Sequence, residues 1–256
     1  MRALLYNIEY LEGTTQGIWQ YLDFYHVLRP RFNLDKNILT FLENQNADVI
    51  GLVEVDGGNF RHNPDMITFF KNNLGFKDVC HGIKYGYDSL ARKIPVLKNQ
   101  ENALITKNKL LSSKKHMLSV GSKRLILEAS VELDEEEKSA VTFLLVHLAL
   151  FKKTRAIQIK ELCSIINKIK TPVILMGDFN TFSRKELDYV FDNTSLVDSF
   201  AFRQGGKLAA TEPSWNPRYR LDNILVTKNI KVNNYEILDV HYSDHLPVLI
   251  DFNLKK

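Results

Sequence analysis

The stretch Val173-Ile174-Leu175-Met176-Gly177-Asp178-Phe179-Asn180 decides the fold. It follows Thr171-Pro172, and a proline at this point ends the preceding helical pattern. A short apolar run bounded by turn residues is typical of a strand that is buried on both faces. The stretch therefore predicts an internal strand that runs directly into a carboxylate and an amide.

The same strand pattern recurs on both sides of this stretch. Apolar runs predict strands over residues 3–8, 48–55, around 79, 103–106, 124–133, 140–148, 221–227, 232–239 and 247–252. The charged connection 134–138 is too polar for burial and predicts a hairpin loop. Helices are predicted from Asn33 as N-cap, over 63–74 with Pro64 in the first turn, and over 153–168. Because the strands outnumber the helices and do not alternate regularly with them, sheets with helices packed outside are favoured over a doubly wound parallel sheet.

The composition is that of an ordinary globular protein. The chain has 256 residues, of which 45% are hydrophobic and 25% are charged, and its net charge of +4 permits a nucleic-acid partner without arguing for one. We find no internal repeat or Gly/Ser linker, so we expect a single domain over residues 1–256. There is no run of ~18–20 apolar residues and no signal-peptide pattern, so we expect a cytoplasmic protein. Cys80 and Cys163 have no zinc-site spacing and are expected to be reduced and buried.

Polar side chains that close apolar strands carry the functional signal. They are Asn7, Glu54, His147, Asp178, Asn180, Asp222, Asp244 and His245. Because strand ends converge where strands share a sheet, these side chains could meet in one cleft. Carboxylate and amide oxygens are the ligands that Mg²⁺ requires, and a metal with two histidines would offset the cost of burying several carboxylates. The chain has no H-E-x-x-H motif, thiol cluster or P-loop, which leaves zinc proteases and nucleotide-loop enzymes without support.

These residues lie in segments that resemble the endonuclease/exonuclease/phosphatase superfamily of deoxyribonuclease-I-like phosphohydrolases. The matching segments are Leu5-Tyr6-Asn7-Ile8, residues 49–55, 102–106 and 146–148, Gly177-Asp178-Phe179-Asn180-Thr181, residues 213–226, and Ser243-Asp244-His245-Leu246-Pro247-Val248. They stand in the family's order over almost the whole chain, and Gly-Asp-Phe-Asn together with Ser-Asp-His-Leu-Pro is highly specific. The resemblance implies an α/β (α+β) fold, a four-layer α/β/β/α sandwich of two mostly antiparallel sheets packed face to face with helices outside.

The resemblance also implies a metal-dependent phosphohydrolase with its site at one edge of the sandwich. By position, Asn7 and Glu54 correspond to ligands of Mg²⁺, or of Mn²⁺ as a substitute, with Asp244 as a further ligand. Asp178 corresponds to the residue that orients or deprotonates the attacking water, and Asn180 to its partner in holding water or phosphate.

The resemblance implies three further roles around the phosphate. His245 would contact the phosphate, with its ring oriented by Asp222. His147 would donate to a phosphoryl oxygen or assist the leaving group. Asn102, which belongs to a matching segment, is expected to bind substrate together with Asn180 and His147.

The substrate class stays open, because this site cleaves phosphate esters of very different compounds. The segment Ile8-Glu9-Tyr10-Leu11 departs from the Gly-Leu-Arg of apurinic endonucleases, and Pro213-Ser214-Trp215-Asn216-Pro217 departs from the inositol 5-phosphatase signature. We expect a monomeric phosphodiesterase that needs no obligate protein partner. The alternatives are a nuclease on DNA or RNA, a lipid or inositol phosphate phosphohydrolase, and a catalytically silent binding module. A nuclease would use Lys84, Arg92, Lys93 and Lys98 if they line the cleft, whereas such residues more commonly form a solvated surface.

One segment, residues 9–31, does not fit the strand and helix patterns. It follows Asn7 almost directly and carries Trp19, Tyr21, Phe24 and Tyr25. These aromatic residues could shape substrate choice by stacking on bases or by contacting acyl chains, or they could form a small satellite core.

Overall fold

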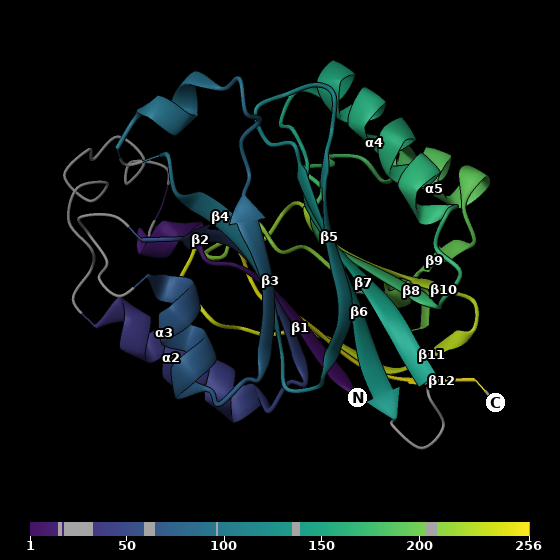
Figure 1. Ribbon diagram of the computed structural model, residues 1–256, viewed down its shortest axis with the longest axis horizontal. Helices are drawn as coiled ribbons and strands as arrows, with labels where there is room; N and C mark the ends of the chain where they lie inside the picture. Colours follow the sequence, from purple (N-terminus) through teal and green to yellow (C-terminus); the bar gives the residue numbers. More distant parts are fainter. Residues whose placement is uncertain are drawn as a thin grey trace.

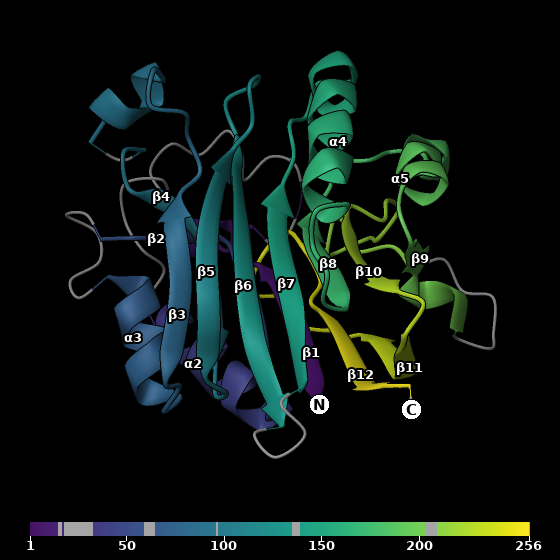
Figure 2. The ribbon, with the colours of Figure 1, turned by 45° about the vertical axis from the view of Figure 1, so that its right-hand side comes forward.

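Two six-stranded sheets lie face to face, and helices cover the outer side of each (Figures 1 and 2). The computed structural model describes residues 1–14, 17, 33–58, 65–95, 97–134, 139–202 and 209–255. Within these ranges the layers follow the order helices, sheet, sheet, helices, which confirms the four-layer sandwich.

The first sheet brings together both ends of the chain. Its strands, in spatial order, are β11 (Ile230–Ile237), β12 (Val248–Leu254), β1 (Arg2–Asn7), β2 (Val49–Asp56), β4 (Gln100–Thr106) and β3 (Asp78–Ile83). The strands β1 and β2 are parallel, and the other neighbours are antiparallel.

The second sheet comes from the middle of the chain and has the same mixed character. Its strands, in spatial order, are β5 (Leu110–Met117), β6 (Leu125–Asp134), β7 (Ser139–His147), β8 (Val173–Asp178), β10 (Asp222–Thr227) and β9 (Leu196–Asp198). The strands β7 and β8 are parallel, and the other neighbours are antiparallel.

Helices form the two outer layers. The helices α2 (Leu34–Gln45) and α3 (Met66–Asn73) pack on the first sheet, while α4 (Lys152–Ile166) and α5 (Asp188–Asn193) pack on the second (Figure 2). Short 3-10 turns lie at Glu9–Leu11, Leu90–Lys93, Arg184–Glu186 and Ser199–Phe202. No helix in the described ranges is long and apolar enough to cross a membrane.

The apolar strand runs are explained by burial on both faces. Successive side chains of a strand point to opposite faces, so Leu5 packs in the core between the sheets while Leu4 packs against the helix layer. Both are fully buried. A strand in this position must be apolar at every residue, which is the pattern that the sequence carries. Cys80 and Cys163 are buried and free, as expected.

The elements that the sequence did not predict are those without this double burial. The strand β5 is an edge strand whose central side chains are exposed, β9 has three residues and α5 has six. Asn33 precedes α2 as expected, but it lies in the left-handed region and its side chain does not cap the helix. The helix α3 does have a side-chain N-cap, because Asp65 accepts from Thr68 N at 2.8 Å. The strands β6 and β7 pair antiparallel, and their connection 135–138 is outside the described residues.

One glycine sets the geometry of the edge where the predicted site residues gather. Gly177 has φ +151°, and a Cβ atom there would lie 2.0 Å from the carbonyl oxygen of Val146. Only glycine fits such a close approach of two backbones. It lets the last residues of β7 and β8 stand side by side, with His147 opposite Asp178.

Candidate active site

The predicted site residues come from both sheets and meet at one edge of the sandwich. The strands β1, β2, β7 and β8 end at this edge, β4 and β10 begin there, and the turn before β12 completes it. Contacts cross from sheet to sheet: Asn7 Nδ2 lies 3.3 Å from Asp178 Oδ2, and Glu54 Oε1 lies 3.8 Å from His147 Nδ1. The site therefore depends on the packing of one sheet against the other.

Glu54 is placed by an irregularity in the first sheet. The pairing of β2 with β4 shifts register after Leu52, so that Val53 and Glu54 together stand opposite Asn102. Glu54 has φ +56°, an unusual conformation for a residue with a Cβ atom. Asn102 Oδ1 accepts from Glu54 N at 3.2 Å and holds it there. A bulge of this kind re-aims a side chain, and here it coincides with an expected metal ligand.

Two lysines and a histidine surround the Glu54 carboxylate. Its Oε1 lies 3.3 Å from Lys84 Nζ, 3.6 Å from Lys123 Nζ and 3.8 Å from His147 Nδ1. Burial raises the pKa of Glu54, and the charge of Lys123 opposes that rise. Lys84 is itself buried, with its ammonium group over the rings of Tyr10 and Tyr85, and burial holds its pKa well below the ordinary value.

His147 is a neutral imidazole in this environment. Burial and the charges of Lys123 and Lys84 hold its pKa well below the ordinary value. Lys123 Nζ is in hydrogen-bond contact with His147 Nε2. The same Nε2 lies 3.3 Å from Asp178 Oδ2, and Nδ1 lies on the side of Glu54.

Asp178 is a buried carboxylate whose pKa lies near neutral pH. Burial raises its pKa to about 7, with the charge of Asp222 adding to the rise and that of His245 opposing it. Its Oδ1 accepts from Asn180 N at 2.9 Å. Asn180 has φ +51°, and its Nδ2 donates to Leu148 O at 2.9 Å, which fixes the turn that follows β8.

Asp222 and His245 form a buried hydrogen-bonded pair. His245 Nδ1 lies 2.7 Å from Asp222 Oδ2, which also accepts from Thr211 Oγ1 at 2.7 Å. Burial disfavours the charged ring, but the carboxylates of Asp222 and Asp244 outweigh it and hold the pKa of His245 well above its ordinary value. The ring is therefore an imidazolium at neutral pH, with Nδ1–H donated to Asp222.

Ser243 ties the turn before β12 to β1. Its Oγ donates to Asn7 O at 2.7 Å, lies 3.1 Å from Asp244 Oδ1 and accepts from His245 N at 3.2 Å. One hydroxyl thus links the end of β1 to both acidic and basic groups of the site. Ser243 lies inside the specific segment of the sequence, but its residue type alone gave no sign of this role.

Asn7, Glu54 and Asp244 offer oxygen donors suited to a hard divalent cation. The crowding of carboxylates favours a cation here, since burial and Asp244 raise the pKa of the neighbouring Glu9 to about 8. Among the described residues, no three His, Cys, Asp or Glu side chains converge as a ready ligand set. Two carboxylates and an amide are donors of the kind that Mg²⁺ accepts, because it takes one or two carboxylates from a protein and keeps several waters.

The structure differs from the sequence-based view of the basic residues. Lys84 is a buried part of the cluster, although the sequence suggested a solvated surface. Lys93 and Lys98 are exposed, and Arg92 stacks on Tyr87, 4.8 Å from the ring centroid. Lys123 was missed, because a lysine in a polar turn gives no signal that its ammonium group reaches a buried histidine. Of the segment 9–31, only residues 9–14 and 17 are described, so Trp19, Tyr21, Phe24 and Tyr25 lie outside the described residues.

Comparisons with known proteins show the family of the chain and support its fold. Residues 29–245 match the model of the Endonuclease/Exonuclease/phosphatase family. No curated protein matches the sequence. Among solved structures, the human Nocturnin catalytic domain with bound sulfate is 19% identical, with a TM-score of 0.73 and coverage of 100% of this chain and 93% of that one.

Two further structures share the fold at similar identity. The mannosyl-6-phosphatase of Bacteroides thetaiotaomicron is 16% identical, with a TM-score of 0.70 and coverage of 99% of this chain and 100% of that one. The TDP2 of D. rerio, solved in complex with a single-strand DNA product, is 17% identical, with a TM-score of 0.69 and coverage of 99% and 98%. At these identities the likeness establishes the fold alone.

Proposed function

Because the chain belongs to the Endonuclease/Exonuclease/phosphatase family, we propose that it is a divalent-metal-dependent phosphodiesterase in which an activated water attacks phosphorus. The observation that carries the proposal is the pairing of two neighbouring carboxylates with two histidines in opposite charge states. Asp178 and Asp222 stand opposite each other in the ladder of β8 and β10. One lies beside the neutral His147, and the other beside the charged His245.

In this proposal Asp178 is the general base. A base works best when its pKa lies near the operating pH, and burial brings the pKa of Asp178 to about 7. Asn180 N and Asn7 Nδ2 hold the two carboxylate oxygens in place. The attacking water gives its proton to Asp178 as its oxygen bonds to phosphorus. The bond from phosphorus to the ester oxygen breaks, and the leaving alkoxide takes its proton from solvent.

His245 acts as the electrophile in this proposal. Its Nδ1–H is committed to Asp222, which fixes the ring and leaves Nε2–H for a phosphoryl oxygen. A hydrogen bond from a charged donor to an anionic oxygen is about twice as strong as one between neutral groups. The role of His147 as a donor to a phosphoryl oxygen stays a prediction.

The remaining groups hold and balance charge. Asn7, Glu54 and Asp244 would hold the cation, which when bound supplies Lewis acidity at a phosphoryl oxygen. Lys123 adds positive charge beside Glu54, which attracts an anionic substrate toward this edge, and Lys84 contacts the same carboxylate oxygen. Asn102, whose Nδ2 has no hydrogen-bond partner among the described residues, would donate to the substrate.

The experiment follows hydrolysis of bis(p-nitrophenyl) phosphate by chelator-treated protein, with and without added Mg²⁺ or Mn²⁺. We expect turnover that depends on the metal, and a loss of ~10²–10⁴-fold in Asp178→Asn. Asp192→Asn, an exposed change of the same kind on α5, is the matched control and should keep full activity. Full metal-dependent activity in Asp178→Asn would remove this residue from the chemistry.

A substrate panel tests the wider alternatives. Plasmid DNA, single-stranded RNA, phospholipid vesicles and inositol phosphates are each incubated with metal-loaded protein. Plasmid cleavage that falls with salt would favour a nuclease, and lipid turnover would favour a phospholipase-like role. No turnover of any compound by folded, metal-loaded protein would contradict the proposal and support a binding module.

A further inference from the structure

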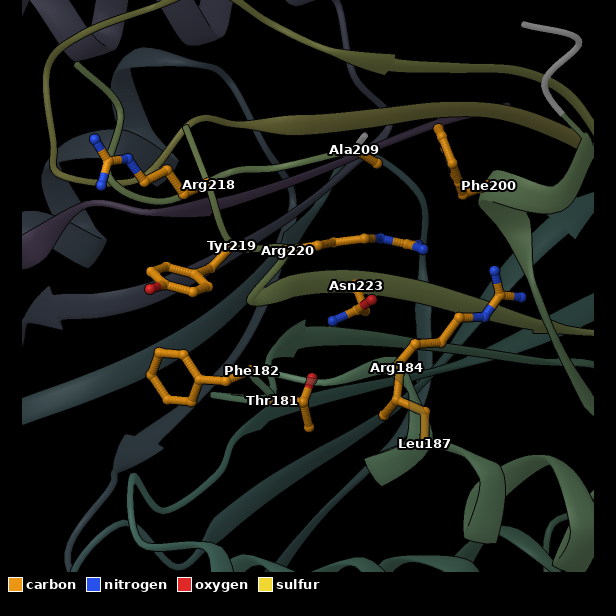
Figure 3. A pocket seen from close by; sticks show the side chains of 10 residues that line it. All are labelled: Thr181, Phe182, Arg184, Leu187, Phe200, Ala209, Arg218, Tyr219, Arg220 and Asn223. Carbon is orange, nitrogen blue, oxygen red and sulfur yellow. The ribbon is translucent and has the colours of Figure 1, made fainter. Parts of the chain in front are cut away.

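A second concave site has a lining that includes none of the candidate active-site residues. Figure 3 shows the side chains that line it. This pocket has a volume of about 350 Å³, within the range of small-molecule sites. Two of its residues, Thr181 and Asn223, directly follow the active-site residues Asn180 and Asp222 in sequence. Because successive strand residues face opposite sides, Asn223 turns away from the pair of Asp222 and His245. The pocket therefore borders the reacting centre without sharing its side chains.

Two aromatic rings stand together on one side of the pocket. Phe182 and Tyr219 are packed edge to face, with ring centroids 5.2 Å apart (Figure 3). Both remain exposed, at 49% and 43%. Rings that had only a packing role would be expected to lie in the core, whereas these present open faces at a pocket that adjoins a phosphate-ester site.

The pocket is strongly basic. Arg184, Arg218 and Arg220 line it, and no acidic residue does so among the described residues. Arg220 is held by Asp198 through two hydrogen bonds of 2.7 Å, so its charge is balanced and its position is fixed. The side chain of Arg184 is 69% exposed and lies 3.8 Å from the same carboxylate. Arg184 and Arg218 thus leave a positive excess at the surface that favours an anionic ligand.

Two polar side chains line the pocket beside the apolar Leu187, Phe200 and Ala209. Asn223 is 1% exposed and Thr181 is 4% exposed, and the Asn223 amide donates one hydrogen bond, to Leu221 O. A planar heterocycle offers both a face for the rings and polar edges for the amide and hydroxyl.

We propose that this pocket binds the base of a nucleotide whose phosphate ester lies in the adjacent active site. The base stacks on Tyr219 and Phe182, and its polar edge faces Asn223 and Thr181. The positive charge of Arg184 and Arg218 attracts the phosphate of the nucleotide, which lies in the adjacent active site. The assignment rests on the proposed phosphodiesterase function for the identity of the reacting group. It narrows the substrate class to nucleotide esters.

Binding is measured first without catalysis, so that the pocket is tested apart from the enzyme activity. Thymidine 5′-monophosphate is titrated into chelator-treated protein by calorimetry. Base stacking predicts that Tyr219→Ala weakens binding by about tenfold or more, while Tyr219→Phe keeps the ring and the affinity. Tyr189→Ala, which removes an exposed ring on α5, is the control and should bind as the wild type does. Equal affinity in Tyr219→Ala and the wild type would overturn the proposal.

A separate binding experiment tests the role of Arg184. Arg184→Gln should weaken thymidine 5′-monophosphate binding, and it should change thymidine binding much less, because thymidine has no phosphate. An equal loss for both ligands would show that Arg184 does not act through charge, and it would overturn that part of the proposal.

Catalysis then links the pocket to the active site. The wild type should hydrolyse the p-nitrophenyl ester of thymidine 5′-monophosphate with a higher kcat/KM than methyl p-nitrophenyl phosphate, and Tyr219→Ala should lose most of this preference. Equal rates for the two esters, with no nucleotide binding, would overturn the pocket assignment while the phosphodiesterase stands. Nucleotide binding that depends on Tyr219 in a protein that hydrolyses neither ester would keep the pocket and contradict the phosphodiesterase.

Discussion

The pairing of Asp222 with His245 predicts that the two residues act as one unit in catalysis. The hydrogen bond from Nδ1 to Oδ2 is 2.7 Å long and both groups are buried. A hydrogen bond to a charged group contributes ~1.5–3 kcal/mol, and each 1.36 kcal/mol is a factor of ten in rate. We therefore expect Asp222→Asn to lower kcat/KM by about 10–100-fold through loss of ring orientation and charge. Removal of the electrophile in His245→Ala should cost ~10²–10⁴-fold.

The double variant, with Asp222→Asn and His245→Ala together, shows whether the two residues act as one unit or independently. If Asp222 acts only through His245, the double variant should be no worse than His245→Ala within a few fold, because the carboxylate then has no ring to hold. Independent roles would instead multiply to ~10³–10⁶-fold. The assay is kcat/KM on bis(p-nitrophenyl) phosphate for wild type, both single variants and the double variant, at a fixed metal concentration.

The free energy of unfolding of each variant must be measured together with its kcat/KM. Asp222 Oδ2 also accepts from Thr211 Oγ1, so Thr211→Val tests whether any loss comes from the carboxylate's position. We expect Thr211→Val to lower kcat/KM when His245 is present and to change kcat/KM little in the His245→Ala background. A double variant whose loss equals the product of the single losses, in folded protein, would refute the pairing as a catalytic unit.

Three further predictions follow from groups already described or from their neighbours. Glu54→Gln should weaken Mg²⁺ or Mn²⁺ binding in calorimetry while the circular dichroism spectrum stays unchanged, and unchanged metal affinity would exclude Glu54 as a ligand. Arg155 is 2% exposed and hydrogen bonded to Glu186 at 2.5 Å. Changing it to Met should lower the free energy of unfolding by about 3–5 kcal/mol, because the partly buried Glu186 carboxylate loses its partner; urea unfolding measures this, and a loss below 1 kcal/mol would contradict it. Burial raises the pKa of Asp198 but Arg220 lowers it further, so that the net pKa lies below its ordinary value. As the pH falls, the carboxyl group of Asp198 therefore takes up its proton in the unfolded chain before it does so in the folded protein. The stability that Asp198 contributes is present above pH ~4 and is lost below it. The difference in the free energy of unfolding between the wild type and Asp198→Asn should shrink from pH 7 to pH 3.

Most of the layer structure was predictable because it depends on burial that the sequence displays. The run 173–176 is apolar at every residue since β8 has neighbours on both faces and on both sides. The edge strand β5 could not be predicted in this way, because its central residues face water and carry serines and lysines. Double burial leaves a pattern in the sequence, and the exposed centre of β5 does not.

The site was predictable as a set of residue types and not as a geometry. Asp178 and His245 stand out because polar groups at the ends of apolar strands are unusual. The bulge that aims Glu54 depends on a register shift against β4, which no local pattern encodes. Lys84 and Lys123 reach the cluster through the approach of distant segments, and a lysine in a sequence is more commonly a surface group.

The pairing of β1 with β12 has a consequence for the time at which the protein becomes active in a cell. Met1 N donates to Phe252 O across 251 positions, so β1 waits for its partner while the residues between them are synthesised. At ~5–20 residues per second this wait is about 12–50 s. During it, one edge of β1 stays unpaired on the nascent chain and must avoid wrong partners. Ser243 is synthesised near the end of that interval, so a nascent chain that still lacks it cannot yet bring its proposed cation ligands together.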